Sequence, residues 1–499
     1  MDSYSKLVDN NEPRVEILDN SSLMDTMDDA KETDNLFNQI PSKIEYTVED
    51  AVEHIGFGKF QLWLIFVCGL FSATDALEML LLSVLSPALR CDFKLTEVQV
   101  AFITTIVFVG MFSGSFLWGT ISDKYGRLIT MFVSSIWILY FGIGTAFSPN
   151  YYWMLILRGI VGFAFGGAIQ SFTLISEYLP SKYRAKVLII YSLMWAVGSL
   201  FEIGMASIII PRWGWRVLVA VSALPMLLTS VCVWTLPESA RFLVASGRHN
   251  QAYNVLNYIA YKNGKTLPSK NLISLVQIKK PNVMDLFRGD YLRTSLQVWF
   301  IWFLVAFSYY GMILGQSEIL EFKHITRVHT ETSPVHEISQ CHCNSLSSSD
   351  YNSMVIATLG EFVAIPFNLF TIDWLGRKYT LMINFLIAGL AFLLILVSSN
   401  KMVLTFFVFL VRAFTSGLFN CIYIYTIEVY PTIVRSSGLG IGSSMARIGA
   451  MLTPFVSQVL LNYSLTAAIS LYGVLCILCA VNAFYLKHET SGKKMKQTT

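Results

Sequence analysis

Two carboxylic acids lie inside a stretch of the sequence that is otherwise apolar. The segment from Gln61 to Leu89 is long enough to cross a bilayer as a helix, which takes about 20 apolar residues for ~30 Å of hydrocarbon. Asp75 and Glu78 interrupt this segment. Ionisable groups at such depth are costly and serve proton transfer, binding of a charged substrate or pairing with a buried base. The chemistry indicated is therefore electrostatic and takes place within a membrane.

The depths of residues within the bilayer indicate a basic partner for these acids. At ~1.5 Å per residue, Asp75 lies about 21 Å from the start of its span and about 9 Å from the opposite face of a ~30 Å core. Arg158 lies in a later apolar run that starts at Tyr152 and crosses in the other direction, so it is also about 9 Å deep. We expect Asp75 to pair with Arg158, with Glu78 one turn outward and Glu202 close by. The pair is either a proton-coupling device or a static contact between helices.

A second set of ionisable residues is expected near the midplane of the C-terminal half. Glu361, Arg412 and Arg447 each lie about ten residues into an apolar run, close to ~15 Å deep. An arginine without a partner is suited to anions because its guanidinium binds a carboxylate through two hydrogen bonds. The alternative is that Glu361 neutralises Arg412 or Arg447 for structure alone. The candidates for the aromatic wall of a substrate cavity are Tyr309, Tyr310 and Tyr423.

Twelve apolar runs of spanning length carry these residues, in a chain that is 54% hydrophobic and 14% charged. They are expected at 61–86, 98–118, 129–147, 152–176, 186–208, 215–235, 294–315, 351–372, 380–398, 402–427, 437–460 and 464–486. The pattern predicts an all-α membrane protein with two six-helix bundles, 45–236 and 294–486. A polar linker with short helices, 237–293, joins them. We expect a disordered acidic tail at 1–44, a long outer loop at 316–350 and a basic tail at 487–499.

The distribution of lysine and arginine predicts the orientation. With the N-terminus in the cytoplasm, the short inner loops hold eight of these residues, the linker holds nine, and the outer side holds seven. Cytoplasmic loops carry the excess of positive charge in membrane proteins. Both termini are therefore expected on the cytoplasmic side.

Two motifs occur twice at nearly the same offset. The first copies consist of Gly119, Asp123, Gly126 and Arg127 and of Glu177 and Arg184. The second copies, 250 or 251 positions later, consist of Asp373, Gly376 and Arg377 and of Glu428 and Arg435. A duplicated six-helix unit is typical of secondary transporters whose substrate site lies between the halves. We expect these residues to form the contacts of a cytoplasmic gate, or alternatively to act only as determinants of topology.

Other classes of function find little support in the sequence. A net charge of +3 without a basic aromatic cluster argues against nucleic-acid binding. The segment Gly264, Lys265, Thr266 lacks the first glycine of a phosphate loop, so catalysis and a bound cofactor are not expected. Histidines accompany Cys341 and Cys343 in the outer loop, but their spacing is poor for a metal. A disulfide, with Cys91 as a candidate partner, is the preferred interpretation.

The repeated motifs resemble those of the major facilitator superfamily. Its loop signature is matched at Gly119, Asp123, Gly126 and Arg127 but not at Leu128, and the second copy has Leu369 in place of the first glycine. The segment from Pro237 to Leu243 is similar to an element of sugar porters and organic-ion transporters. The segments IGFGKFQ, ALEMLLLSVLSP, WAVGSLFEIG and RAFTSG resemble the synaptic vesicle 2-related group. This resemblance extends over residues 45–490.

The resemblance implies a function and a location. In similar proton-coupled sugar porters, an aspartate at the position of Asp75 pairs with an arginine at that of Arg158. Arg447 stands where organic anion transporters carry an arginine. We therefore expect a monomeric secondary transporter of small anionic or zwitterionic organic solutes, coupled to protons, in a vesicle or plasma membrane. The alternative is a transporter-like vesicle protein that binds or traffics without transport.

Overall fold

A computed structural model describes residues 46–267, 286–287, 290–331, 346–398, 400–430 and 432–490. The predictions for the acidic tail 1–44, for Cys341 and Cys343 and for most of the basic tail lie outside these residues. Cys91 is disulfide-bonded, as the sequence indicated for this residue.

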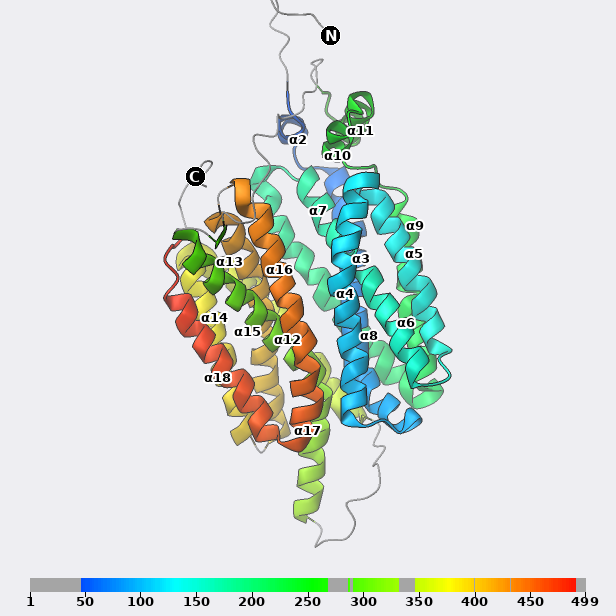
Figure 1. The fold of residues 1–499 in the computed structure, drawn as a ribbon, viewed down its shortest axis with the longest axis vertical. Coiled ribbons are helices and arrows are strands. Elements are labelled where there is room, and N and C mark those ends of the chain that lie inside the picture. Colours follow the sequence, from blue (N-terminus) through cyan, green and yellow to red (C-terminus); the bar gives the residue numbers. More distant parts are fainter. Residues whose placement is uncertain are drawn as a thin grey trace, which may run out of the picture.

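The helices form two bundles that stand side by side (Figure 1). The N-terminal half contains α3 (Lys59–Phe93), α4 (Glu97–Tyr125), α5 (Arg127–Ala146), α6 (Tyr151–Phe165), α7 (Ile169–Tyr178), α8 (Ser181–Ala223) and α9 (Pro225–Val233). The C-terminal half contains α12 (Asp290–Glu331), α13 (Ser348–Trp374), α14 (Arg377–Val397), α15 (Lys401–Val429), α16 (Thr432–Pro454), η2 (Phe455–Leu460), α17 (Leu461–Tyr463) and α18 (Leu465–Phe484).

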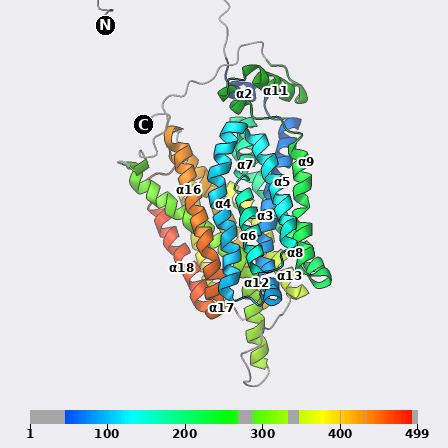
Figure 2. The same cartoon turned by 45° about the vertical axis from the view of Figure 1, so that its right-hand side comes forward.

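Three short helices gather at one end of the bundles. They are α2 (Val48–Ile55), α10 (Ala240–Ala245) and α11 (His249–Lys262), and both views place them beyond the ends of the long helices (Figures 1 and 2). We call this the linker end, and the opposite end the far end. Arg241 of α10 forms an ion pair with Glu49 of α2, which ties the linker to the segment that leads into α3.

The prediction of twelve spans is confirmed. Eleven helices are long and apolar enough to cross a membrane, and one of them, Ser181–Val233, is 53 residues long. It contains a break at Gly214, whose φ of 79° is left-handed, so it comprises the fifth and sixth predicted spans. Glycine is suited to this position because it has no Cβ to clash at positive φ.

The expected start of the long outer loop at residue 316 is wrong. Helix α12 continues to Glu331, and its residues Gln316 and Glu318 are buried. Their polar side chains suggested a loop, but they contact other helices of the bundles, as described below.

Small residues bring the site-bearing helices close together. A Cβ atom on Gly162 of α6 would clash with the backbone of Val107 of α4. A Cβ atom on Gly198 of α8 would clash with the backbone of Ala73 of α3. Such contacts let membrane helices approach closely where hydrophobic burial gives no driving force. They fix α6 and α8, which carry Arg158 and Glu202, against the rest of the N-terminal half.

Candidate functional site

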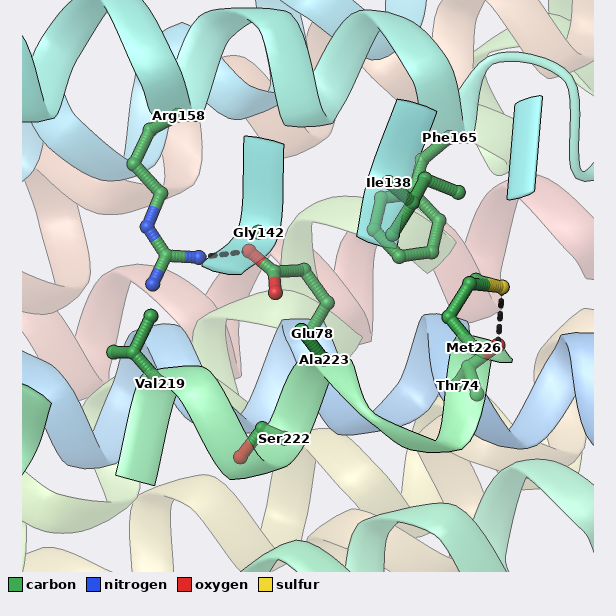
Figure 3. A pocket seen from close by; sticks show the side chains of 10 residues that line it. All are labelled: Thr74, Glu78, Ile138, Gly142, Arg158, Phe165, Val219, Ser222, Ala223 and Met226. Carbon is green, nitrogen blue, oxygen red and sulfur yellow. Dashed lines mark hydrogen bonds and ion pairs between the residues drawn. The ribbon is translucent and has the colours of Figure 1, made fainter. Parts of the chain in front are cut away.

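A buried ion pair lies inside the N-terminal half. Arg158 of α6 donates from Nη1 to Oε1 of Glu78 on α3 (Figure 3). The side chains are 1% and 11% exposed. Both line a small cavity, together with Ser222 and Met226, that has room for about one water molecule. The pair is thus largely removed from solvent.

The predicted pairing of Asp75 with Arg158 is wrong, because Glu78 takes that place. Asp75 and Glu78 are three residues apart, so they point about 60° apart around α3 and differ by ~4.5 Å in depth. The longer side chain of Glu78 reaches Arg158, while Asp75 faces the C-terminal half. Depth alone did not distinguish the two acids.

Glu202 completes the group around Arg158, which we call the N-half cluster (Glu78, Arg158 and Glu202). Glu202 is fully buried, accepts hydrogen bonds from the Ser222 hydroxyl at 2.9 and 3.1 Å, and interacts electrostatically with Glu78 and Arg158. Arg158 keeps Nε and Nη2 without hydrogen-bond partners. Two acids and one base are electrically neutral only when one acid carries a proton. A buried cluster of this composition therefore favours binding of one proton.

The C-terminal half has a different buried group, the C-half cluster (Gln316, Tyr309, Glu361 and Arg412). Arg412 of α15 donates to Glu361 of α13 from Nη2 and, at 3.1 Å, from Nε. Gln316 accepts from Arg412 at 3.1 Å, and the Tyr309 hydroxyl donates to Glu361 at 3.1 Å. One acid and one base are already neutral without a proton. The alternative in which Glu361 neutralises Arg412 is the arrangement found.

Arg447 of α16 faces Asp75 of α3 across the boundary between the halves. The two interact electrostatically, and Arg447 also interacts with Tyr310 and Tyr423. The expectation that Arg447 lacks a compensating charge is therefore wrong. Asp75 supplies that charge from the other half, a relation that distance along the chain does not reveal. Of the predicted aromatic residues, Tyr310 and Tyr423 are partly exposed beside Arg447, whereas Tyr309 is buried in the C-half cluster.

The repeated motifs at the linker end form repeated structures. In the first copy, Arg127 contacts Glu177 at 3.5 Å and Asp123 at 3.3 Å. In the second, Arg377 donates two hydrogen bonds of 2.9 Å to Glu428. Each of these pairs lies within one half.

The other predicted gate residues lie at the same end. Arg184 donates to the Leu179 carbonyl and interacts electrostatically with Glu49 and Glu53, Asp373 is exposed, Arg435 is half-buried, and Gly119 has open space where a Cβ would stand.

Two further acids take part, and the motif search missed them. Glu238 accepts the backbone N–H groups of Arg127 and Leu128 at the start of α5, and Glu489 accepts those of Arg377 and Lys378 at the start of α14. Their own separation of 251 positions was the available signal. Gly126 and Gly376 have positive φ angles of 109° and 91°, and the absence of a Cβ at both leaves space for these carboxylates.

Glu238 and Glu489, which cap the first backbone N–H groups of α5 and α14, give a testable prediction. Glu238→Ala and Glu489→Ala are each expected to lower the free energy of unfolding by about 1–2 kcal/mol, because two backbone donors lose their acceptor. Thermal unfolding of the purified protein measures the effect. Asp123→Ala is the control, since Asp123 is 79% exposed and its pair contributes little. Equal effects of all three variants would contradict the prediction.

Polar contacts join the two halves at the far end, and we call this group the far-end latch. Arg90 of α3 contacts Glu318 of α12 at 2.8 Å, and Asn462 of α17 donates to Glu97 of α4 at 2.9 Å. Gln458 of η2 donates to Ser86 of α3 at 2.8 Å. The halves are therefore held together at this end. Asn462, whose amide nitrogen makes these contacts, is also the asparagine of a glycosylation sequon.

The far-end latch predicts a shift in conformation when it is broken. Glu318→Gln is expected to open the far end, since the charge-assisted bond to Arg90 contributes about 1–3 kcal/mol. A cysteine at buried Ser83, whose hydroxyl lies 3.3 Å from that of Ser317, reports opening through its rate of maleimide labelling. We expect a rise of about tenfold. Asp92→Asn, which removes an exposed ion pair within one half, is the control. An unchanged rate would show that the latch does not hold the halves.

Among the described residues, no group of three or more His, Cys, Asp or Glu side chains is arranged to hold a metal ion. Between the linker end and the far end, the ionisable groups that the folding brings together include the N-half cluster, the C-half cluster and the Asp75–Arg447 pair. Two lie inside single halves, and the third lies between them.

Comparisons with known proteins agree with this architecture. A profile described as "Sugar (and other) transporter" matches residues 43–315, and one described as "Major Facilitator Superfamily" matches residues 344–498. Synaptic vesicle 2-related protein of Xenopus laevis is 43% identical over 92% of this chain and 84% of its own length. SVOPL of Homo sapiens is 39% identical over 92% of this chain and 95% of its own length.

A solved structure shares the fold. The partially occluded inward open form of the xylose transporter XylE from E. coli superposes with a TM-score of 0.67 at 17% identity, over 87% of this chain and 99% of that one. The chain belongs to the major facilitator superfamily of multi-pass membrane transporters, in the group of synaptic vesicle 2-related proteins.

Proposed function

We propose that this protein is a proton-coupled secondary transporter of small anionic or zwitterionic organic solutes, working by alternating access. The observation that carries the proposal is the placement of two ionisable groups on one helix. Glu78 of α3 belongs to the N-half cluster, and Asp75, one turn away, faces Arg447 of the opposite half. A change of charge in the N-half cluster can therefore act on the substrate site through one turn of α3.

The proton is carried by the N-half cluster in this proposal. With the proton bound, Glu202 is neutral beside Ser222, and ionised Glu78 holds Arg158. When the proton leaves, Glu202 is ionised as well, and it competes with Glu78 for Arg158, whose Nε and Nη2 atoms have no hydrogen-bond partner. The electrostatic attraction between α3 and α6 therefore changes, and with it the preferred conformation of the N-terminal half. Each proton bound or released thus favours one conformation of that half.

The C-half cluster has a structural part in this proposal. Its acid and base neutralise each other, and Tyr309 and Gln316 satisfy further hydrogen-bonding groups. Its members keep the C-terminal half rigid, so that it moves as one body against the N-terminal half. The substrate contacts expected of Glu361 and Arg412 are accordingly moved to Asp75, Arg447, Tyr310 and Tyr423.

Alternating access uses the two ends of the molecule. The far-end latch closes one side, and its bonds must break for the substrate site to open there. The ion pairs at the linker end lie within each half and stiffen the loops that move apart. The excess of lysine and arginine supports a cytoplasmic linker end, and the similarity to synaptic vesicle 2-related proteins supports a vesicle membrane.

Uptake into proteoliposomes tests the proposed function. The purified protein, reconstituted with an imposed pH gradient, is given a panel of small organic acids, amines and zwitterions, and accumulation is measured by mass spectrometry. We expect at least one compound to accumulate only when the gradient is present. Empty liposomes and liposomes with the gradient collapsed by an ionophore are the controls. If no compound accumulates, the protein is a transporter-like binding or trafficking protein instead.

A further inference from the structure

The Asp75–Arg447 pair differs from the other buried ion pairs in its geometry. Asp75 and Arg447 attract each other electrostatically, yet the described residues give no ion pair or hydrogen bond between them. The hydrogen bond that Arg447 makes, from Nη1 to the Ser443 hydroxyl at 2.9 Å, is a bond within its own helix. The Oδ1 atom of Asp75 is buried and has no hydrogen-bond partner. Two opposite charges therefore face each other without being joined.

Both charged residues are less buried than the arginines of the two clusters. Asp75 and Arg447 are each partly exposed, whereas Arg158 and Arg412 are fully buried within single halves. The charged groups that interact with Asp75 are Arg447 and Glu78, and the hydroxyls of Tyr191 and Tyr310 also lie near it. Arg447 is thus the cation that faces Asp75 among the described residues, since Arg158 is held by Glu78.

Aromatic side chains from both halves gather around Tyr310, which interacts electrostatically with both Asp75 and Arg447. The ring of Phe108 lies 5.0 Å from that of Tyr310, and the ring of Trp195 lies 6.4 Å from that of Tyr309, centroid to centroid. Phe419 contacts Tyr310 at 6.3 Å. The indole Nε1 of Trp195 is buried without a partner, like Oδ1 of Asp75. Planar and cationic groups are favoured against such ring faces.

Charge balance selects among the kinds of solute that can bind here. Asp75 and Arg447 sum to zero, so an added anion or cation leaves one uncompensated charge in a site poor in water. A zwitterion adds no net charge, and it places its cationic group against Asp75 and its anionic group against Arg447. Each charge of the protein then has a partner of opposite sign. Guanidinium groups also bind carboxylates through two parallel hydrogen bonds, which fixes the orientation of the ligand.

We infer that the substrate is a small zwitterion with an apolar or aromatic body, bound with its carboxylate at Arg447 and its ammonium group at Asp75. This inference rests on the proposed function. It narrows the proposed substrates from anionic or zwitterionic solutes to zwitterions alone. The bound zwitterion connects α3 with α16, so it draws the two halves together. An anion held by Arg447 alone would not make this connection.

Matched probes test the inference. L-phenylalanine and L-tryptophan are zwitterions, their amides are cations, and their N-acetyl derivatives are anions of similar shape. Binding to the full-length protein is measured by ligand-induced thermal stabilisation, and transport by uptake into proteoliposomes. We expect the zwitterions to bind about 10- to 100-fold more tightly than either derivative, because a lost partner leaves a buried charge unpaired.

Variants check that the two charges act as assigned. The Asp75→Asn variant is expected to bind N-acetyl derivatives as tightly as zwitterions, because it lacks the partner of the ammonium group. The Arg447→Gln variant is expected to bind amides as tightly as zwitterions, because it lacks the partner of the carboxylate. Equal or tighter binding of a singly charged probe, or no binding of either zwitterion, would overturn the inference. The proposed function is judged separately by the uptake panel. Accumulation of simple anions in that panel would support the proposed transport function and contradict the inferred zwitterionic substrate. The absence of any uptake would contradict the proposed transport function.

Discussion

Glu78→Gln is expected to abolish accumulation of solute against its gradient and to leave exchange of solute across the membrane largely intact. Glutamine has the shape of protonated glutamate, so Arg158 keeps a hydrogen-bond acceptor but loses the charge of Glu78. Glu202 then stays ionised as the counter-charge of Arg158, and the cluster no longer gains or loses a proton. The N-terminal half then has one charge state, and a pH gradient cannot bias its conformations. The loss of gradient-driven uptake is expected to be about 100-fold or more, which corresponds to ~2.7 kcal/mol of coupling free energy.

Asp75→Asn is the matched control, since it removes a carboxylate one turn away on the same helix. It is expected to weaken substrate binding, and therefore to lower both accumulation and exchange. Uptake of radiolabelled solute into proteoliposomes, with and without a pH gradient, separates the two behaviours. If Glu78→Gln accumulates solute normally while Asp75→Asn loses only accumulation, Asp75 is the coupling acid and the assignment from the structure is reversed.

Arg412→Ala is expected to cause the largest loss of stability, about 3–5 kcal/mol, because it leaves the buried carboxylate of Glu361 without its cation. Glu361 is 2% exposed and Arg412 is 0% exposed, so water does not replace the missing partner. Removal of both charges in Arg412→Met with Glu361→Gln is expected to recover part of the loss, since no unpaired charge remains. Thermal unfolding in lipid nanodiscs measures these differences.

Arg216→Ala serves as the control for this series. Its ion pair with Asp92 has side chains that are 46% and 40% exposed, so the variant is expected to cost less than ~1 kcal/mol. If Arg412→Ala is no less stable than Arg216→Ala but fails to take up solute, Arg412 binds substrate and the structural assignment of the C-half cluster is wrong.

The positions of the helices could be predicted from the sequence because the membrane imposes a length and a composition on every span. The break between the fifth and sixth spans followed from the same rule, and Gly214 accounts for it in the structure. The start of the outer loop was not predictable in this way. Gln316 and Glu318 are polar, yet the helix continues through them because their side chains meet Arg412 and Arg90.

The partners of the buried charges were harder to predict. Depth along a helix follows from residue number, but the direction of a side chain around the helix depends on how that helix packs. The choice between Asp75 and Glu78 turned on this direction. Arg447 and Asp75 are 372 positions apart and lie in different halves, so only the assembled fold brings them face to face. Glu238 and Glu489, 251 positions apart, are the residues that the repeat itself could have revealed.

The most direct test measures solute and proton movement in the same proteoliposomes, with a pH-sensitive dye trapped inside. We expect that adding an accepted solute, without an imposed gradient, changes the internal pH of proteoliposomes that hold the wild-type protein. In Glu78→Gln, solute moves without protons. Solute uptake by the wild-type protein with no change of internal pH would contradict the account, as would proton movement that persists in Glu78→Gln.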